Sequence, residues 1–93
     1  MSNGQHRITF EDRGGGTLGT SIIVHGAPDN AAGVHAEYEF LARKFGTRGA
    51  DWRPLRQSTG ETKGRRWDRI VVALANGRKK AVYFDITEFF GKR

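Results

Sequence analysis

The feature that most constrains the fold is a pair of apolar, β-branched segments, residues 67–75 and 79–87, joined around Asn76-Gly77. Both residues of that dipeptide tolerate positive φ, as a type I′ turn requires, so we predict a hairpin with a two-residue turn. This pairing places one apolar set on one face: Val71, Ala73, Val82, Phe84 and Ile86. It places a second set on the other face: Ile70, Val72, Leu74, Ala81 and Tyr83.

Both apolar faces of the sheet have to be buried, and one helix can bury only one of them. The second face is therefore expected to lie under the N-terminal hairpin or against another subunit. A homodimer is one expectation, because exposed apolar patches usually mark interfaces. The alternative is a sheet whose strands are buried on both faces within one domain.

The N-terminal third predicts two strands separated by a glycine-rich loop. Alternating polar and apolar residues indicate a strand over 6–11, and a β-branched run indicates a second strand over 20–25. Three consecutive glycines between them predict that 13–19 is flexible, because ordering glycine costs much backbone entropy. Residues 1–5 are polar and are expected to be flexible as well.

Apolar residues at the helical period predict one helix over 31–45. Asp29 or Asn30 is expected to cap its start, and Gly46 its end. Phe40 lies off the apolar stripe and is expected to be a rim contact or an exposed anchor. The stripe consists of Ala31, Val34, Tyr38, Leu41, Ala42 and Phe45.

The segment 51–58 is predicted to be an edge strand, since Pro54 cannot donate a ladder hydrogen bond. Residues 59–64 are predicted to be a polar loop, and Phe89 or Phe90 is expected to pack against the sheet. The prediction is a single α+β domain over residues 1–93, with the order β-β-α-β-β-β. Its antiparallel or mixed sheet carries one helix packed on one face.

The composition excludes several classes of chemistry. The 93-residue chain has no cysteine, which excludes disulfides, thiolate metal sites and cysteine nucleophiles. This favours a reducing compartment, and we expect the protein to be cytoplasmic. The longest apolar run, 70–75, is too short to cross a bilayer, so no membrane partner is expected. No motif indicates a cofactor, and we expect none.

The charge is divided unevenly along the chain. Residues 1–42 carry two basic and five acidic residues, whereas residues 43–93 carry fourteen basic and five acidic ones. This asymmetry predicts an anionic partner for the second half, nucleic acid or another polyanion. Arginine pairs with phosphate, and tryptophan stacks on bases. The predicted binding residues are Arg53, Arg56, Arg65, Arg66, Arg69, Arg78, Lys79, Lys80, Trp52 and Trp67.

Asp68 and Asp85 are weak metal candidates. A two-residue turn would place them directly opposite each other on neighbouring strands, where like charges are destabilising unless compensated. A divalent cation, a shared proton or a nearby arginine could compensate them, and arginine is the simplest of these. A nuclease site would combine them with Glu37 or Glu39, but the chain lacks the acidic-x-Lys strand motif common in such sites.

Three hypotheses of function follow. The leading one is a small non-enzymatic binding module that contacts nucleic acid or another polyanion through its C-terminal half. The alternative is a protein–protein interaction or inhibitor protein of the phage or mobile-element type. It would act through an apolar sheet face with Phe40, Phe89 and Phe90. The third is a metal-dependent enzyme with a site at Asp68, Asp85 and Tyr83.

Overall fold

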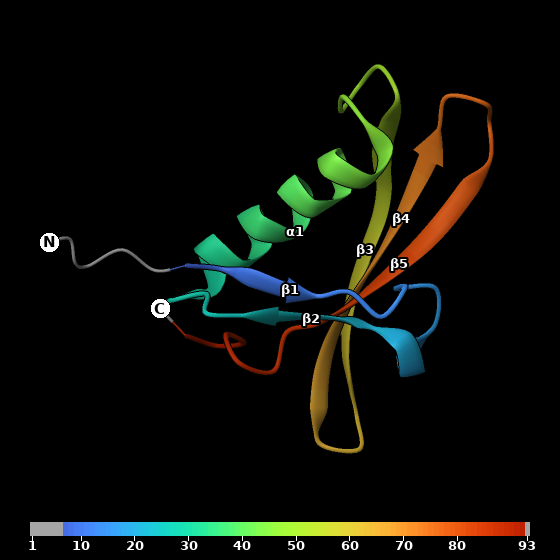
Figure 1. The fold of residues 1–93 in the computed structure, drawn as a ribbon. Helices are drawn as coiled ribbons and strands as arrows, with labels where there is room; N and C mark the ends of the chain where they lie inside the picture. Colours follow the sequence, from blue (N-terminus) through green and yellow to red (C-terminus); the bar gives the residue numbers. More distant parts are fainter. Residues whose placement is uncertain (1–6, 93) are drawn as a thin grey trace, which may run out of the picture.

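The computed structural model describes residues 7–92, so His6 and residues 1–5 lie outside it. A five-stranded sheet carries one helix against one side (Figure 1). The strands are β1 (Thr9–Glu11), β2 (Ile22–His25), β3 (Trp52–Thr62), β4 (Arg65–Leu74) and β5 (Lys79–Asp85), and the helix is α1 (Asn30–Phe45). The sheet order is β1-β2-β5-β4-β3, in which β2 and β5 are parallel and the other pairs are antiparallel. The α+β prediction is confirmed.

The helix begins and ends at the expected caps. The Asp29 side chain accepts a hydrogen bond from the Ala32 N–H over 2.8 Å, which satisfies one of the free donors of the first turn. At the other end Gly46 has a φ of 110°, and its N–H donates to the Ala42 carbonyl over 2.8 Å. Arg43 and Lys44 lie in the last turn, where cations suit the helix dipole.

The turn between β4 and β5 is one residue longer than predicted. Ala73 pairs with Lys79, and the Leu74 N–H donates to the Arg78 carbonyl, so three residues form the loop. Gly77 has a positive φ of 86°, whereas Asn76 does not adopt positive φ. Its side chain instead accepts a hydrogen bond from the Arg78 N–H. The type I′ turn is therefore wrong, because Asn-Gly serves a three-residue loop equally well.

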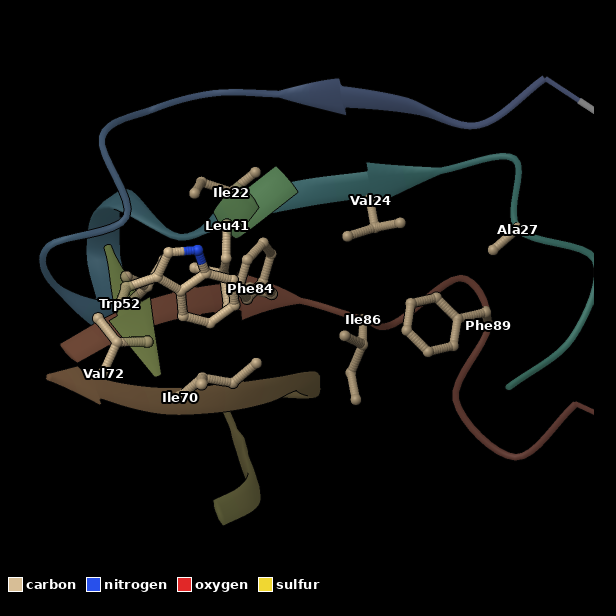
Figure 2. Close-up of a cluster of buried hydrophobic side chains, with 11 residues drawn as sticks. Ile22, Val24, Ala27, Leu41, Trp52, Ile70, Val72, Phe84, Ile86 and Phe89 are labelled. Carbon is tan, nitrogen blue, oxygen red and sulfur yellow. The ribbon is translucent and has the colours of Figure 1, made fainter. Parts of the chain in front are cut away.

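This one-residue difference moves every β5 side chain to the other face relative to β4. Ile70 now lies opposite Val82, and Asp68 lies opposite Phe84. The fully buried side chains of both strands consequently share the face under α1, and the predicted division of residues between the two faces is wrong. The opposite face keeps Val71, Ala73, Ala81 and Tyr83, all of them partly exposed. The core is drawn in Figure 2 and includes Ile22, Leu41, Trp52, Ile70, Val72, Val82, Phe84, Ile86 and Phe89.

The hairpin of β3 and β4 is longer than the sequence indicates. Residues 59–62 belong to β3 rather than to a loop, and the chain turns through Lys63 and Gly64, whose φ angles are 52° and 79°. Both φ angles are positive, as in a type I′ turn. Polar composition suggested a loop, but the outer strand of a sheet can be polar on both faces. β3 is indeed an edge strand, with its register shift between Pro54 and Arg56.

The glycine-rich segment between β1 and β2 is attached to the sheet. The Gly15 N–H donates to the Thr20 carbonyl, and the Gly15 carbonyl accepts from the Tyr83 N–H over 2.8 Å. Gly15 has a φ of 73° and is buried where a Cβ would overlap Ile22. The segment ends in a short 3-10 helix, Leu18–Thr20, capped by Thr17.

Candidate nucleic-acid interface

The sheet face opposite α1 gathers most of the predicted binding residues. The register of the three long strands places Arg53, Arg65, Arg69 and Lys79 on this side, although they come from three different elements. We call it the open face and define it by Arg53, Arg56, Arg65, Trp67, Arg69, Lys79, Tyr83 and Asp85. Asp85 is the one acidic residue in this set.

Most of the cations on the open face are unpaired. Among residues 7–92, Arg53, Arg56, Arg69 and Lys79 form no ion pair with an acidic side chain. Arg69 is held in place by its Nε–H, which donates to the Tyr83 hydroxyl over 3.1 Å. Unpaired guanidinium groups on a strand surface can bind phosphate oxygens with little rearrangement.

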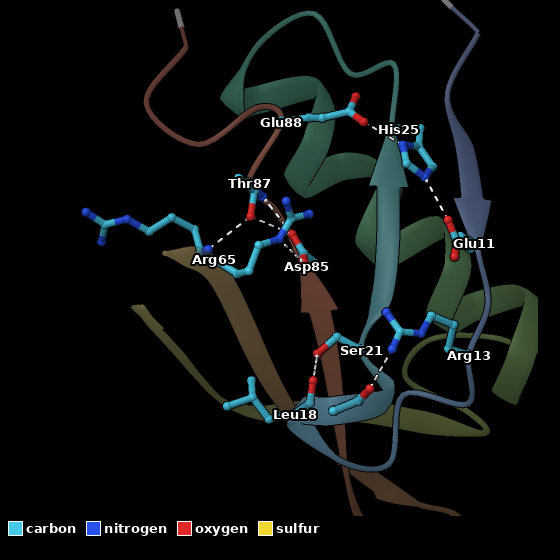
Figure 3. A network of polar contacts seen from close by, with 11 residues as sticks. Glu11, Arg13, Leu18, Ser21, His25, Arg65, Asp85, Thr87 and Glu88 are labelled. Carbon is cyan, nitrogen blue, oxygen red and sulfur yellow. Dashed lines mark hydrogen bonds and ion pairs between the residues drawn. The ribbon is translucent and has the colours of Figure 1, made fainter. Parts of the chain in front are cut away.

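Arg65 is the exception, because its Nε–H donates to Asp85 Oδ2 over 2.9 Å (Figure 3). Burial opposes ionisation of Asp85, but hydrogen bonds from Arg65 and Thr87 outweigh it and hold the pKa of Asp85 below its usual value. Asp85 Oδ1 accepts from both the Thr87 N–H and the Thr87 hydroxyl. The pair is therefore a fixed structural element at the end of β5.

Two aromatic rings lie between the arginines of the open face. The Trp67 and Tyr83 rings are 6.1 Å apart in an edge-on arrangement. Trp67 covers Gly60 of the neighbouring strand, where any Cβ would overlap the indole, and its Nε1–H donates to the Thr62 hydroxyl. Both rings are half-buried and held in fixed positions, which suits a surface that stacks on bases.

The structure separates four other predicted residues from this surface. Trp52 is 2% exposed and donates from its indole N–H to the Gly46 carbonyl, so its ring belongs to the core. Arg66 pairs with Glu61 and lies over the Phe90 ring, on the other side of the sheet. Lys80 shares that side, and Arg78 directly follows the three-residue hairpin loop.

Asp68 and Asp85 do not form a pair. Because Asp68 lies opposite Phe84, its side chain points toward α1, whereas Asp85 pairs with Trp67 and belongs to the open face. The expected acidic cluster is therefore wrong, and the proposed site of Asp68, Asp85 and Tyr83 is divided between two faces. Within residues 7–92 no group of three or more histidine, aspartate or glutamate side chains could hold a metal ion.

Sequence reasoning missed a buried carboxyl pair between the helix and the sheet. Glu37 is completely buried, and neither of its carboxylate oxygens has a hydrogen-bond donor within the described residues. Burial, together with the neighbouring Asp68 carboxyl group, raises the pKa of Glu37 to about 10. Glu37 thus holds its proton at neutral pH. Asp68 accepts a hydrogen bond from the Thr59 hydroxyl.

A second polar network ties the sheet to the C-terminal turn, as Figure 3 shows. His25 contacts Glu88 through Nδ1 at 2.5 Å and Glu11 through Nε2 at 3.3 Å. Hydrogen bonds to Glu88 and then Glu11 raise the pKa of His25. Glu88 also accepts from the Gly26 N–H, which lowers the pKa of its carboxyl. This network fastens β1, β2 and the C-terminal turn together.

The three aromatic residues proposed as an interface have different surroundings. Phe89 is fully buried over Gly33 of α1, in agreement with the expectation that one of the two C-terminal phenylalanines packs against the sheet. Phe40 is half-buried and packs on Phe10 at 4.9 Å. Phe90 is 41% exposed beneath the Arg66 guanidinium. They do not form one surface.

No protein-family model, curated protein or solved structure matches this chain. Within the described residues, no helix is both long and apolar enough to cross a membrane.

Proposed function

We propose that this protein binds nucleic acid through the open face of its sheet. The observation that supports this most strongly is the convergence of Arg53, Arg65, Arg69 and Lys79 from three strands onto the side that α1 leaves uncovered. Charge alone would be weak support, since basic residues also serve solubility. Here the cations flank two fixed aromatic rings, and this combination serves phosphates and bases together.

The open face is suited to both parts of a nucleotide. Phosphates carry the negative charge that unpaired arginines and lysines neutralise, and this contributes most of the non-specific affinity. The Trp67 and Tyr83 rings offer stacking surfaces between the arginines, and each stacked base adds about 1–3 kcal/mol. No catalytic group is needed for this function.

The interaction-protein alternative has less support. It depended on an apolar sheet face and on Phe40, Phe89 and Phe90. The observed register turns the fully buried residues of β4 and β5 toward α1, and Phe89 lies in the core.

The proposal is tested by measuring how affinity depends on salt. A labelled single-stranded oligothymidine would be titrated at several salt concentrations and followed by fluorescence anisotropy. Four unpaired cations on the open face predict that the logarithm of the affinity falls by about 3 per log unit of salt, from about 0.7 per phosphate. Absent or salt-independent binding would contradict the proposal.

Matched double variants locate the binding surface. Arg53→Ala with Lys79→Ala removes two exposed cations from the open face, and the slope should become shallower by about 1.4. Arg43→Ala with Lys44→Ala removes the same charge from the exposed end of α1 and should leave the slope unchanged. Equal losses from both double variants would show that net charge, and not the open face, determines binding.

A further inference from the structure

A pocket lies where the open face meets the loop before β2. Its volume is about 440 Å³, within the range of roughly 300–1,000 Å³ that is usual for small-molecule sites. Its apolar walls are Leu18, Ile23 and Trp67, which come from three separate segments. Leu18 is 37% exposed, so its side chain is accessible to a ligand in this pocket.

The charged residues around this pocket are almost all basic. Arg13, Lys63, Arg65 and Arg66 line it, and Asp85 is the one acidic residue present. Both Asp85 oxygens already accept hydrogen bonds from Arg65 and Thr87. Arg66 pairs with Glu61, and the Arg13 guanidinium donates to the Gly19 carbonyl over 2.7 Å (Figure 3). The groups left over for a ligand are therefore the Lys63 ammonium and the remaining guanidinium N–H groups, all of them hydrogen-bond donors.

This chemistry matches one nucleotide unit with its base inserted. An aromatic base would be enclosed by Leu18, Ile23 and the Trp67 indole, and its acceptor atoms and phosphate would meet the basic residues. A base in a duplex is paired and stacked, and removing it costs a few kcal/mol. An unpaired base enters without that cost. The pocket adjoins the open face through Trp67 and Arg65, so one strand can occupy both.

We infer that the pocket takes one unpaired base of a single strand whose neighbouring nucleotides lie along the open face. The inference rests on the proposed function and deepens it, since it predicts selection of single strands over duplexes. It also assigns a binding role to Leu18, Ile23 and Lys63.

The test compares two substitutions and three probes by anisotropy at low salt. Leu18→Ala shortens the pocket wall. Leu55→Ala is its control, because Leu55 is similarly exposed but lies near the start of β3, whereas the pocket lies at the end of that strand. The probes are labelled oligothymidine, a strand of the same length that lacks all bases, and a duplex of the same length. Circular dichroism checks that both variants fold.

Leu18→Ala should weaken oligothymidine binding by about tenfold, as loss of apolar contact in a pocket does, and leave the base-free strand unaffected. Leu55→Ala should change neither, and the duplex should bind more weakly than oligothymidine. Equal effects of the two substitutions, or equal affinity for duplex and single strand, would overturn the inference but not the proposed function. Failure of the wild-type protein to bind any of the three probes would overturn both.

Discussion

Glu37 of α1 and Asp68 of β4 bring two carboxyl groups together between the helix and the sheet, where Glu37 is completely buried and Asp68 is 2% exposed. Two carboxylates cannot both ionise at such a site, because each destabilises the charge of the other. The pKa of about 10 for Glu37 means that this residue is protonated in the folded protein at neutral pH. The pair makes stability depend on pH in a predictable direction.

Glu37→Gln should remove this pH dependence. Between pH 4.5 and about pH 10 the folded state binds a proton on Glu37 that the unfolded state has released, so the free energy of unfolding falls as pH rises. The difference between wild type and variant should change by about 1.4 kcal/mol per pH unit across that range. Denaturant unfolding at several pH values measures it.

Glu39→Gln is the matched control, since Glu39 lies two residues further along α1 and is exposed. This substitution should leave the pH profile of the wild type almost unchanged. If Glu37→Gln gave the same slope as wild type, the assignment of the proton to Glu37 would be wrong.

His25 should titrate above its ordinary pKa of 6.5. Its hydrogen bonds with Glu88 and Glu11 favour the protonated ring, so their stabilisation is present below pH 6.5 and is lost as pH rises through the folded-state pKa. A proton NMR titration of the His25 ring measures this. Glu88→Gln should lower the pKa of His25 more than Glu11→Gln does. Equal shifts would contradict the larger effect of the Glu88 hydrogen bond.

Gly33→Ala should destabilise the protein, although alanine normally favours a helix over glycine by about 1 kcal/mol. A Cβ at this position would overlap the ring of Phe89, which is fully buried. Overpacking of this kind costs about 1–3 kcal/mol, measured by thermal or denaturant unfolding. Phe89→Leu in the same chain should recover part of the loss. A Gly33→Ala variant more stable than wild type would contradict this packing.

Lys63→Asn should stabilise the β3–β4 hairpin. Lys63 has a φ of 52°, which costs an ordinary side chain about 1 kcal/mol, whereas asparagine tolerates it. The free energy of unfolding should rise by several tenths of a kcal/mol up to about 1 kcal/mol. Since Lys63 also lines the pocket, the same substitution should weaken oligothymidine binding. A variant that is less stable than wild type would contradict the positive φ of Lys63 in this turn.

The sequence predicts the helix and the existence of both long strands because these depend on local signals. The Asp29 and Gly46 caps and the β-branched runs carry that information. The register between β4 and β5 cannot be predicted from local signals, since Asn76-Gly77 fits loops of two or three residues. A single residue in that loop decides whether Ile70 and Val82 share a face, and only packing of the whole sheet against α1 favours one choice.

The candidate site was predictable in part for the same reason. Arg65 and Arg69 share a face with Trp67 because strand side chains alternate. The same alternation places Arg66 on the opposite face. Tyr83 could have been assigned to this face only with the correct register. The predicted apolar stripe omits Glu37 because charged residues are rarely buried, yet Glu37 lies four residues before buried Leu41 and on the same side of the helix.

The two tryptophan indoles give the most direct test of nucleic-acid binding at the open face, in one NMR experiment. Unlabelled oligothymidine would be titrated into ¹⁵N-labelled protein while the two indole N–H signals are followed. The Trp67 signal should shift with added strand, together with the Nε–H signals of the open-face arginines, whereas the Trp52 signal should stay fixed, because that ring is 2% exposed. Movement of Trp52 and the α1 signals while Trp67 stays fixed, or no movement at all, would contradict binding at the open face.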